Sequence, residues 1–515
     1  MAFQNEAWRA FSDERNQDLI NEDLMNLSKK LGRSYPLVIG GRQAFTAQST
    51  SSHNPSDPGE VIGEVSSAEK QHAEHAIKAA REAFKSWRFV GPEQRAEYLF
   101  HVARQMRAAK VRLTSLIIKE AGKNRVEADA DVCEAIDFLE FYGHEMIRVG
   151  APYKTQDYPG EINTVQYIPR GVAAVIAPWN FPLAILTGMT AAALVTGNTV
   201  VMKPASQTPV IGYYLMDMFI KSGLPEGVLN YLPGPGEVVG EYLVTHPAVS
   251  LVAFTGSMQA GLRIVNLASQ AKEGQSGVKR VIGEFGGKNG VIVDETAVLE
   301  DAASGISASA FGYSGQKCSA ASRVIALEPV YNEVLERLLD HAKNIRIGRA
   351  EDQDTYIGPL ISKEQLEKVK RYIEIGKSEA TLALEIEPPQ LHGWFAGPVI
   401  FSNVKPDARI AQEEIFGPVV AVIKARNMDE ALAIANSTKY GLTAGIYSRT
   451  EENIARFKRE IDAGNRYINR KITGSIVERQ PFGGYKMSGV GSKAGGRDYL
   501  PQFMIPVSIA ERIVE

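Results

Sequence analysis

The sequence predicts an α/β protein built around a doubly wound parallel sheet. Short β-branched runs begin at Val172, Thr199, Val228 and Val249, and each is followed by Pro or Gly and then by a helical stretch. This alternation is typical of right-handed βαβ units. The chain has 515 residues, of which 44% are hydrophobic and 23% charged, so we expect a globular protein of about two to four domains.

Further elements are expected on both sides of this region. Pro92 opens a helical pattern, and helices therefore precede the sheet. The segment YPGEINTVQYIPRG (158–171) alternates in character and predicts a hairpin, an element that commonly meets another subunit when it projects. From about Glu284 a second α/β segment begins, with a helix expected over 331–345. These features predict a second lobe.

The loops that follow the predicted strands should face one crevice, because ligands of such sheets bind at the carboxyl ends of the strands. In PGPGEVVG, Gly236 and Gly240 open a helix, as do Gly256 and Ser257 in FTGSMQAG. Such turns bring backbone N–H groups to a pyrophosphate, which indicates a Rossmann-type site. The alternative is that the glycines only tighten βα turns. Lys203, in KPASQTP, is either a ribose partner or an ordinary solvated lysine.

The composition argues against several classes of partner. The 57 basic and 60 acidic residues are mixed along the chain and give a formal net charge of −3, so we expect neither nucleic acid nor a membrane surface as a partner. No run approaches the ~18 apolar residues of a membrane span, and we expect a cytoplasmic protein. Two cysteines, Cys133 and Cys318, indicate a reducing compartment. The histidines lack metal-ligand spacing, so no metal site is expected.

Cys318 is the most conspicuous candidate for chemistry. It lies in FGYSGQKCSAASR among small and polar residues, whereas an inert core cysteine is usually flanked by large aliphatic side chains. Its thiolate becomes a nucleophile if Lys317, a helix dipole or a bound cationic nicotinamide lowers the pKa. We therefore expect a presented and activated thiol, and we interpret Cys133 as a structural one.

Two other residues suit the same chemistry. Glu284, in VIGEFGGKNG, follows a strand and precedes two glycines, so its carboxylate can stand in the crevice as a base. Asn180, in PWNFP, lies on a rigid turn, and its amide can stabilise an oxyanion. Taken singly, each has an ordinary explanation: a solvated glutamate, and a turn-forming asparagine.

Seven motifs in order give these residues a common meaning. The motifs APWNFP, KPAS, FTGS, GEFGGK, GQKCSAASR, EEIFGP and PFGGYKMSG resemble the aldehyde dehydrogenase superfamily over nearly the whole chain. The resemblance implies that Cys318 attacks an aldehyde, and that Asn180 and the Cys318 backbone N–H hold the oxyanion. It also implies that Glu284 activates the water that cleaves the thioester.

The resemblance further implies a nicotinamide cofactor. Lys203 would hold the adenine ribose, Ser257 a pyrophosphate oxygen and Glu414 the nicotinamide ribose. Many NAD-preferring relatives have Glu three residues after the lysine, where it repels a 2′-phosphate. Here that residue is Ser206, so we expect NADP to be accepted as well as NAD. The cofactor set is Ile176, Pro178, Trp179, Lys203, Ser206, Gly236, Gly240, Phe254, Gly256, Ser257, Glu414 and Phe416.

Four segments carry a closer resemblance within the family: QKCSAASR, RIAQEEIFGP, DVCEAIDFLEFYG and especially NRKITGSIVERQPFGGYKMSG. They most resemble the Δ1-pyrroline-5-carboxylate (L-glutamate γ-semialdehyde) dehydrogenases. That substrate has a carboxylate and an ammonium remote from the reacting carbon, and a site that pairs both gains specificity. The resemblance places Gly474 and Ser475 at the carboxylate and Glu134 at the ammonium, with aromatic walls along the aliphatic carbons. The expected substrate set is Glu134, Phe181, Lys317, Ser319, Gly474, Ser475 and Phe482. Plain core packing is the alternative for the aromatic residues.

The predicted organisation follows from these assignments. We expect a helical arm (1–45), a dinucleotide-binding domain (46–150 and 173–283), a catalytic domain (284–485), and an oligomerisation hairpin with a C-terminal segment (151–172 and 486–515). A homodimer or higher homo-oligomer is expected. The implied reaction is the second step of proline catabolism, which makes a proline dehydrogenase an expected functional partner.

Three alternatives stay open at this point. An amidase or nitrilase could use Cys318, Glu284 and Lys288, but it would not need the nucleotide crevice. A non-catalytic dinucleotide-binding protein would need neither Cys318 nor Glu284. Within the enzyme class, the alternative is a dehydrogenase that acts on another small aldehyde.

Overall fold

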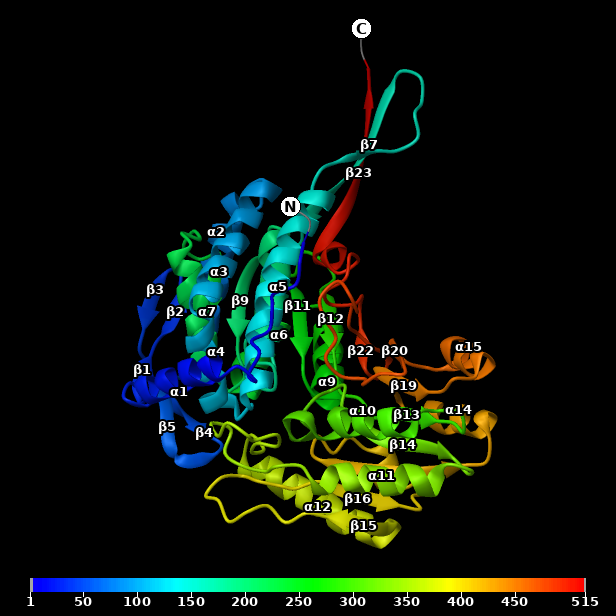
Figure 1. The fold of residues 1–515 in the computed structure, drawn as a ribbon. Coiled ribbons are helices and arrows are strands. Elements are labelled where there is room, and N and C mark those ends of the chain that lie inside the picture. The colour runs from blue at the N-terminus through cyan, green and yellow to red at the C-terminus, as the bar shows by residue number, and fades with distance from the viewer. Residues whose placement is uncertain (1–2, 514–515) are drawn as a thin grey trace.

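The strands that alternate with helices in the first part of the chain form one large sheet (Figure 1). The computed structural model describes residues 3–513, and within them this sheet has eight strands in the order β22-β12-β11-β8-β9-β10-β2-β3. Its parallel part consists of β8 (Val172–Ile176), β9 (Thr199–Lys203), β10 (Leu229–Tyr231), β11 (Val249–Thr255) and β12 (Arg280–Glu284). The predicted doubly wound sheet is confirmed.

Both faces of this sheet are covered by helices. Ala173 and Val175 of β8 pack into one hydrophobic core, whereas Val172 and Ala174 pack into another. Side chains of a strand alternate between faces, so a strand covered on both sides needs an apolar residue at every position. The covering helices are α3 (Pro92–Ala108), α5 (Arg125–Val149) and α6 (Ala184–Val195) in the first core, and α2 (Lys70–Trp87), α8 (Glu241–Thr245) and α9 (Met258–Ser269) in the second.

The N-terminal segment corrects one prediction. The expected helical arm 1–45 is helical only in α1 (Glu14–Ser28), while β1 (Arg33–Tyr35), β2 (Leu37–Ile39) and β3 (Arg42–Ala44) follow it. Gly40 and Gly41 have φ values of 57° and 77°, as a two-residue hairpin turn requires. This turn joins β2 to β3, and β2 pairs with β10 at the sheet edge. The purely helical arm was therefore wrong; residues 1 and 2 lie outside the described residues.

A second α/β lobe follows β12, as the sequence predicts. Its sheet has the order β15-β16-β17-β14-β13-β19-β20 among the described residues. The strands are β13 (Asn289–Val293), β14 (Ala321–Leu327), β15 (Thr381–Glu385), β16 (Val399–Ser402), β17 (Val419–Ala425), β19 (Thr443–Tyr447) and β20 (Asn465–Ile468). The helices include α10 (Leu299–Phe311), α11 (Tyr331–Lys343), α12 (Lys363–Glu379), α14 (Met428–Asn436) and α15 (Glu451–Glu460).

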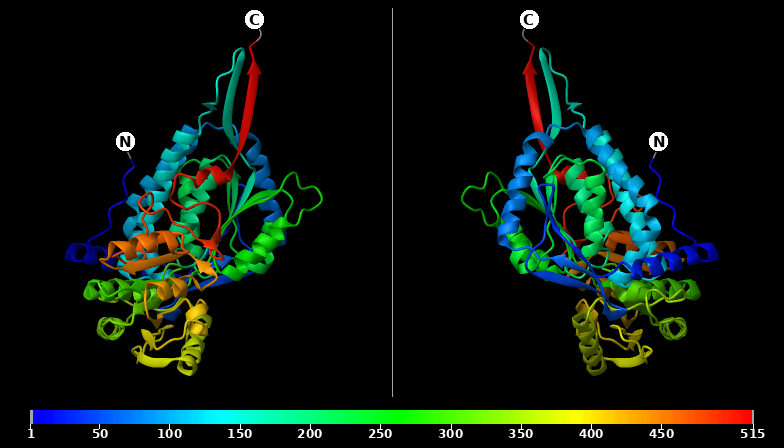
Figure 2. Two further views of the ribbon diagram at one scale, coloured as in Figure 1. Left: turned by 90° about the vertical axis from the view of Figure 1, so that its right-hand side faces the viewer. Right: turned by 90° about the vertical axis from the view of Figure 1, so that its left-hand side faces the viewer.

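A narrow antiparallel sheet projects from the body of the protein (Figure 2). It consists of β6 (Tyr153–Lys154), β7 (Glu161–Pro169) and β23 (Met504–Arg512). The local hairpin predicted over 158–171 is only part of it, because the long partner of β7 is the C-terminal strand β23, paired from Met504 with Pro169 to Arg512 with Glu161. Residues 514 and 515 of the predicted C-terminal segment lie outside the described residues.

The two lobes contain further helices and strands. They include β4 (Ser49–Asn54), β5 (Asp57–Ser66), α4 (Lys110–Ala121), α7 (Pro209–Lys221), α13 (Arg409–Gln412), β18 (Tyr440–Gly441), β21 (Tyr485–Lys486) and β22 (Gly489–Val490). None of the helices in residues 3–513 has the length and apolar character needed to span a membrane.

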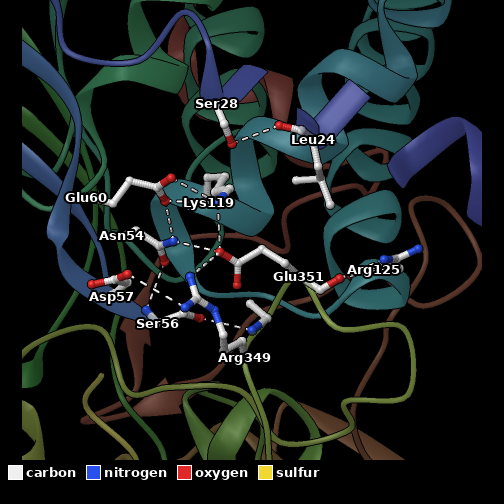
Figure 3. A network of polar contacts seen from close by, with 11 residues as sticks. Leu24, Ser28, Asn54, Ser56, Asp57, Glu60, Lys119, Arg125, Arg349 and Glu351 are labelled. Atoms are coloured by element: carbon white, nitrogen blue, oxygen red, sulfur yellow. Dashed lines mark hydrogen bonds and ion pairs between the residues drawn. The ribbon is translucent and has the colours of Figure 1, made fainter. Parts of the chain in front are cut away.

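A polar network joins the two lobes around Lys119 of α4 (Figure 3). The Lys119 ammonium lies 2.9 Å from an oxygen of Glu60 and 2.9 Å from an oxygen of Glu351, which belongs to the second lobe. Asn54 donates to the same two carboxylates at 2.7 and 2.8 Å. Since the Lys119 side chain is only 7% exposed, this cation compensates two carboxylates at the lobe interface.

Removal of that cation should weaken the contact between the lobes. Lys119→Ala leaves Glu60 and Glu351 facing each other, and breaking a buried ion pair on one side costs about 3–5 kcal/mol. We expect the lower end, about 3 kcal/mol, because Glu60 is 25% exposed and Arg349 still faces Glu351 at 3.4 Å. The measurement is the shift of the urea unfolding midpoint.

The matched control is Arg337→Ala, which removes a cation from two exposed carboxylates, Glu300 and Glu333. Exposed pairs contribute about 0–1 kcal/mol, so this variant should unfold nearly like the wild type. Equal midpoint shifts for the two variants would show that Lys119 makes no special contribution.

Candidate active site

The two lobes enclose a cavity of about 180 Å³ that contains the predicted nucleophile. Its walls come from the loops after β8, β11 and β12, from the Cys318 loop and from the segment after α13. Its lining includes Pro178, Trp179, Asn180, Gly256, Ser257, Phe285, Gly286, Cys318, Glu414 and Phe416. A cavity of about 520 Å³ between α12 and β15 is larger, but none of the predicted site residues lines it.

Cys318 follows a turn of left-handed backbone. Tyr313, Ser314 and Gly315 have φ values of 52°, 55° and 69°, a conformation that non-glycine residues adopt at an energetic cost. The Tyr313 hydroxyl donates to the Ala121 carbonyl at 2.8 Å, and the Ser314 hydroxyl donates to the Gly358 carbonyl at 2.8 Å. Neither Tyr313 nor Ser314 was predicted to shape the site, and in the sequence only Gly315 indicates a turn.

Hydrogen bonds also fix the residues on either side of the nucleophile. The Asn180 amide donates to the Gln316 carbonyl at 3.0 Å, and the Gln316 side chain accepts from the Ile361 N–H at 2.9 Å. Asn289 donates to the Cys318 carbonyl at 2.8 Å. Asn180 therefore lies next to the Cys318 loop and is not merely a helix cap.

The environment of the thiol corrects a second prediction. Burial, together with the negative charges of Glu414 and Glu284, raises the pKa of Cys318 to about 12. Lys317 was one of the three groups that could lower this pKa, but its ammonium lies 2.6 Å from a carboxylate oxygen of Glu127. Lys317 does not lower the thiol pKa here, because its charge is paired with a carboxylate of α5.

Glu284 ends β12 beside a close approach of backbone. Its carboxylate accepts from the Gly484 N–H at 3.1 Å, and a Cβ on Gly483 would lie 2.5 Å from the other oxygen. Burial raises the pKa of Glu284 to about 8, against the opposing effects of the Gly484 bond and the Lys493 charge. The ordinary explanation of a solvated surface glutamate does not hold.

The residues expected at the cofactor fall into three groups. Pro178, Trp179, Gly256, Ser257, Glu414 and Phe416 line the Cys318 cavity. Lys203 is buried and adjoins Gly240, where a Cβ would lie 3.9 Å from its side chain. Gly236 begins the five-residue helical segment that ends at Gly240. Ile176 and Phe254 are buried in a hydrophobic core at the ends of their strands, and their contact with the cofactor stays a prediction.

Ser206 lies apart from the Cys318 cavity. It is exposed and lines a separate cavity of about 380 Å³ together with His53 and Lys363. The structure therefore does not bring Ser206 into contact with the nucleophile, and its link to the cofactor stays a prediction.

The chemistry of this lining fits a dinucleotide. Ser257 caps the N-terminus of α9 by accepting from the Ala260 N–H at 3.2 Å, and helix N-termini favour phosphate. Burial lowers the pKa of Lys203 to about 8. Within the described part of the chain, the one hydrogen bond of its ammonium goes to the carbonyl of the neighbouring Pro204, 3.3 Å away. Glu414 accepts from the Gly287 N–H at 2.9 Å through one carboxylate oxygen, and no hydrogen bond from residues 3–513 reaches the other.

The residues expected at the substrate adjoin a row of charges on α5. Glu127 and Asp131 of this helix pair with Lys317 and Lys123 at 2.6 and 2.9 Å. Glu134 completes the row, and burial raises its pKa to about 8. The spacing 127, 131, 134 places three acidic residues on one helical face, a signal in the sequence that could have revealed Glu127 and Asp131.

Aromatic and loop residues complete these surroundings. The Lys123 ammonium lies 3.6 Å from the centre of the Phe181 ring, and Phe482 forms a two-way backbone bridge with Ala494 at 2.8 Å. Gly474 has a φ of 71°. Among the described residues, no protein oxygen accepts a hydrogen bond from the N–H of Gly474 or Ser475. Ser319, next to the nucleophile, is buried.

A partly buried thiol, a carboxyl at the end of a parallel strand and a dinucleotide crevice between two α/β lobes define a thiol-dependent nicotinamide dehydrogenase. The chain belongs to the aldehyde dehydrogenase family, whose model matches residues 43–509. The resemblance drawn from the seven motifs is thereby confirmed. Lys288, which an amidase would use, lines a different cavity from Cys318.

Individual relatives narrow the branch of the family. The chain is 48% identical over 509 residues, 99% of both chains, to 1-pyrroline-5-carboxylate dehydrogenase of Geobacillus sp. (strain WCH70). It resembles the structure of 1-pyrroline-5-carboxylate dehydrogenase from Thermus with bound NAD, with a TM-score of 0.98, 46% identity and 99% coverage of both chains. Proline utilization A (PutA) from Bdellovibrio bacteriovorus gives a TM-score of 0.99 and 46% identity, over 100% of this chain and 54% of that one.

The charge of Glu414 should control the reactivity of Cys318. Glu414→Gln removes the carboxylate with the largest effect among the three, Glu414, Glu284 and Glu134, whose charges raise the thiol pKa. Each unit of pKa changes the thiolate fraction tenfold. We expect iodoacetamide labelling of Cys318 at pH 8.5 to become about three- to tenfold faster. Peptide mass spectrometry measures the rate.

Cys133 is an internal control in the same sample. Its pKa is also raised to about 12 by burial, but the nearest acid is Asp129. Its labelling should be unchanged in Glu414→Gln. Equal acceleration at both cysteines would indicate a loosened fold, and no acceleration at Cys318 would show that the Glu414 charge does not act on the thiol.

Proposed function

We propose that this protein oxidises L-glutamate γ-semialdehyde, the open form of Δ1-pyrroline-5-carboxylate, to L-glutamate. The observation that carries the proposal is the state of Glu134. Its two acidic neighbours on α5 are paired with lysines, whereas no hydrogen bond or ion pair from the described residues holds the Glu134 carboxyl. An unpaired carboxyl whose charge acts on Cys318 supplies a partner for a substrate ammonium.

The groups proposed to bind the substrate carboxylate lie in the loop after β20. Gly474 and Ser475 offer backbone N–H groups that no protein oxygen uses among the described residues. Lys471, whose ammonium would lie 3.7 Å from a Cβ on Gly474, adds positive charge. This combination favours a carboxylate. Ammonium and carboxylate together describe an α-amino acid that carries an aldehyde.

Each protein group then has one task. Cys318 attacks the aldehyde carbon and forms a thiohemiacetal, and the Asn180 amide with the Cys318 N–H stabilises its oxyanion. When bound, the nicotinamide supplies a hydride acceptor. Glu284 takes a proton from the water that cleaves the resulting thioester, which releases the acid and regenerates the thiol. Phe181 and Phe482 exclude water beside the aliphatic carbons.

The cofactor we propose is NAD, with NADP as an alternative. Trp179 and Phe416, whose ring centres lie 5.5 Å apart and nearly perpendicular, form one wall for it. Ser257, Lys203 and Glu414 would bond the pyrophosphate and the two riboses. The neutral Ser206 near Lys363 does not repel a 2′-phosphate.

We also propose a homo-oligomer, a cytoplasmic location and a proline dehydrogenase as functional partner. The projecting sheet exposes large apolar side chains, namely Tyr153, Tyr158, Ile162, Ile505 and Ile509. Such exposure on a sheet edge supports contact with a second copy. The similarity to part of PutA supports a link to the preceding step of proline oxidation.

The base role of Glu284 predicts a specific pH profile. A base must be deprotonated, and the pKa of Glu284 is about 8. Steady turnover should therefore rise with pH and level off above about 8.

Glu284→Gln cannot take the proton, so stopped-flow absorbance should show a burst of reduced cofactor followed by a slow rate. Wild-type steady turnover in this variant would refute the role, while Cys318→Ala should show neither phase.

The substrate is tested at Ser475. Ser475→Glu places a carboxylate against the substrate carboxylate and removes a charge-assisted bond worth roughly 1.5–3 kcal/mol. We expect kcat/KM for glutamate semialdehyde to fall about tenfold to a few hundredfold, since ~1.36 kcal/mol corresponds to tenfold. Propanal, which has no carboxylate, should lose far less.

Ser475→Ala is the matched control, because it removes the hydroxyl without adding charge. Its loss on glutamate semialdehyde should be smaller than that of Ser475→Glu. Parallel losses on both aldehydes, or a wild type that prefers propanal, would favour a dehydrogenase for another small aldehyde.

A further inference from the structure

The arm that precedes α1 is bound along the helix that carries the acidic row. Residues 3–13 run alongside α5 before the chain enters α1 (Figure 1). The Arg9 N–H donates to Asp129 at 2.9 Å, and Lys110 donates to the Ala7 carbonyl at 2.6 Å. The Phe3 and Phe141 rings lie 5.4 Å apart. The arm is thus ordered by specific contacts with the first lobe.

Asn5 of this arm connects α5 with the loop that contains Gly474 and Ser475. Its amide donates to the Asp137 carboxylate at 2.9 Å and to the Val477 carbonyl at 3.0 Å. The neighbouring Glu6 N–H donates to the other Asp137 oxygen at 2.6 Å. Asp137 and Val477 are each only 4% exposed, so one side chain bridges two buried structural elements.

The two elements so connected carry the two halves of the proposed recognition site. Asp137 lies one helical turn after Glu134, and Val477 lies two residues after Ser475. In an α-amino acid the ammonium and the carboxylate are attached to one carbon. The groups that bind them must therefore keep a fixed separation, since misplacement by about 1 Å can cost much of the gain from binding both.

We infer that Asn5 is a positioning residue that sets the distance between Glu134 and the Gly474–Ser475 loop, and thereby selects aldehydes that carry an α-amino acid group. The inference rests on the proposed function. Asn5 touches neither substrate nor nucleophile. It acts through the Asp137 and Val477 contacts, and its effect is confined to substrates that use both halves of the site.

Other contacts preserve the loop when Asn5 is replaced. The Glu478 N–H donates to the Gly495 carbonyl at 2.8 Å, and the Gly495 N–H donates to the Tyr142 hydroxyl of α5 at 2.8 Å. This indirect connection meets α5 further along the helix and does not involve Asp137. Asn5→Ala should therefore fold, with a loop that is held in place but less closely registered against Glu134.

The test compares Asn5→Ala with Asn16→Ala. Asn16 of α1 donates to the Ala10 carbonyl of the arm at 3.0 Å and accepts from the Arg9 guanidinium at 3.3 Å, and neither bond reaches the Gly474–Ser475 loop. For Asn5→Ala we expect the KM for glutamate semialdehyde to rise about three- to tenfold, with kcat, the KM for NAD and kcat/KM for propanal unchanged. Hydrogen exchange of the peptide that contains residues 474–480 should become faster. Asn16→Ala should match the wild type in every measurement.

A double-mutant cycle separates positioning from general support. If Asn5 acts through the loop, its effect on the semialdehyde KM should shrink when Ser475→Ala is already present, because both changes weaken the same interaction. Additive effects, an equal KM change for propanal, or an unchanged semialdehyde KM in Asn5→Ala would overturn the inference.

The two proposals fail in different ways. A wild type without preference for glutamate semialdehyde over propanal overturns the proposed function and this inference with it. A wild type that shows the preference, with an Asn5→Ala variant that retains it in full, overturns the inference alone.

Discussion

The placement of Cys318 depends on the left-handed turn that precedes it, and the turn depends on both lobes. Two non-glycine residues hold a backbone conformation that costs roughly 1–2 kcal/mol each. Tyr313 is bonded to the end of α4 in the first lobe, while Ser314 and Gln316 are bonded to residues 358–361 of the second. Asn180, from the loop after β8, donates to the Gln316 carbonyl between this turn and Cys318. The nucleophile therefore reaches its position only when the lobes are packed together.

Charge pairing separates the structural from the reactive groups around this thiol. Burial penalises every charge here. In the acidic row on α5, ion pairs of Glu127 with Lys317 and of Asp131 with Lys123 offset this cost. Among residues 3–513, neither Glu134 nor Glu284 forms an ion pair, and burial raises the pKa of each to about 8. A carboxyl poised near neutral pH can exchange a proton or accept an ammonium, whereas a paired one cannot. The absence of a salt bridge is thus what distinguishes the two groups assigned to function.

The loops of the first lobe were predictable because their position follows from local pattern alone. A β-branched run followed by a helix places its connecting loop at the carboxyl edge of a parallel sheet, which located Trp179 and Ser257 without any structure. The role expected of Lys317 failed because its partner, Glu127, is 190 residues away. The strand partner of β7 was missed for the same reason, since β23 lies at the far end of the chain. Pairing across such separations leaves no local signal.

The two ends of the chain show why the site could not be assembled from its motifs alone. Glu284 receives its hydrogen bond from Gly484, and β12 ends against β22, so the position of the Glu284 carboxylate depends on a segment 200 residues later. The loop of Gly474 is bonded to Asn5, at the opposite end of the sequence. Closing loops of this length costs conformational entropy that only the finished core repays. The motifs supply the reactive groups, whereas their distances are set by distant segments that dock once both lobes are packed.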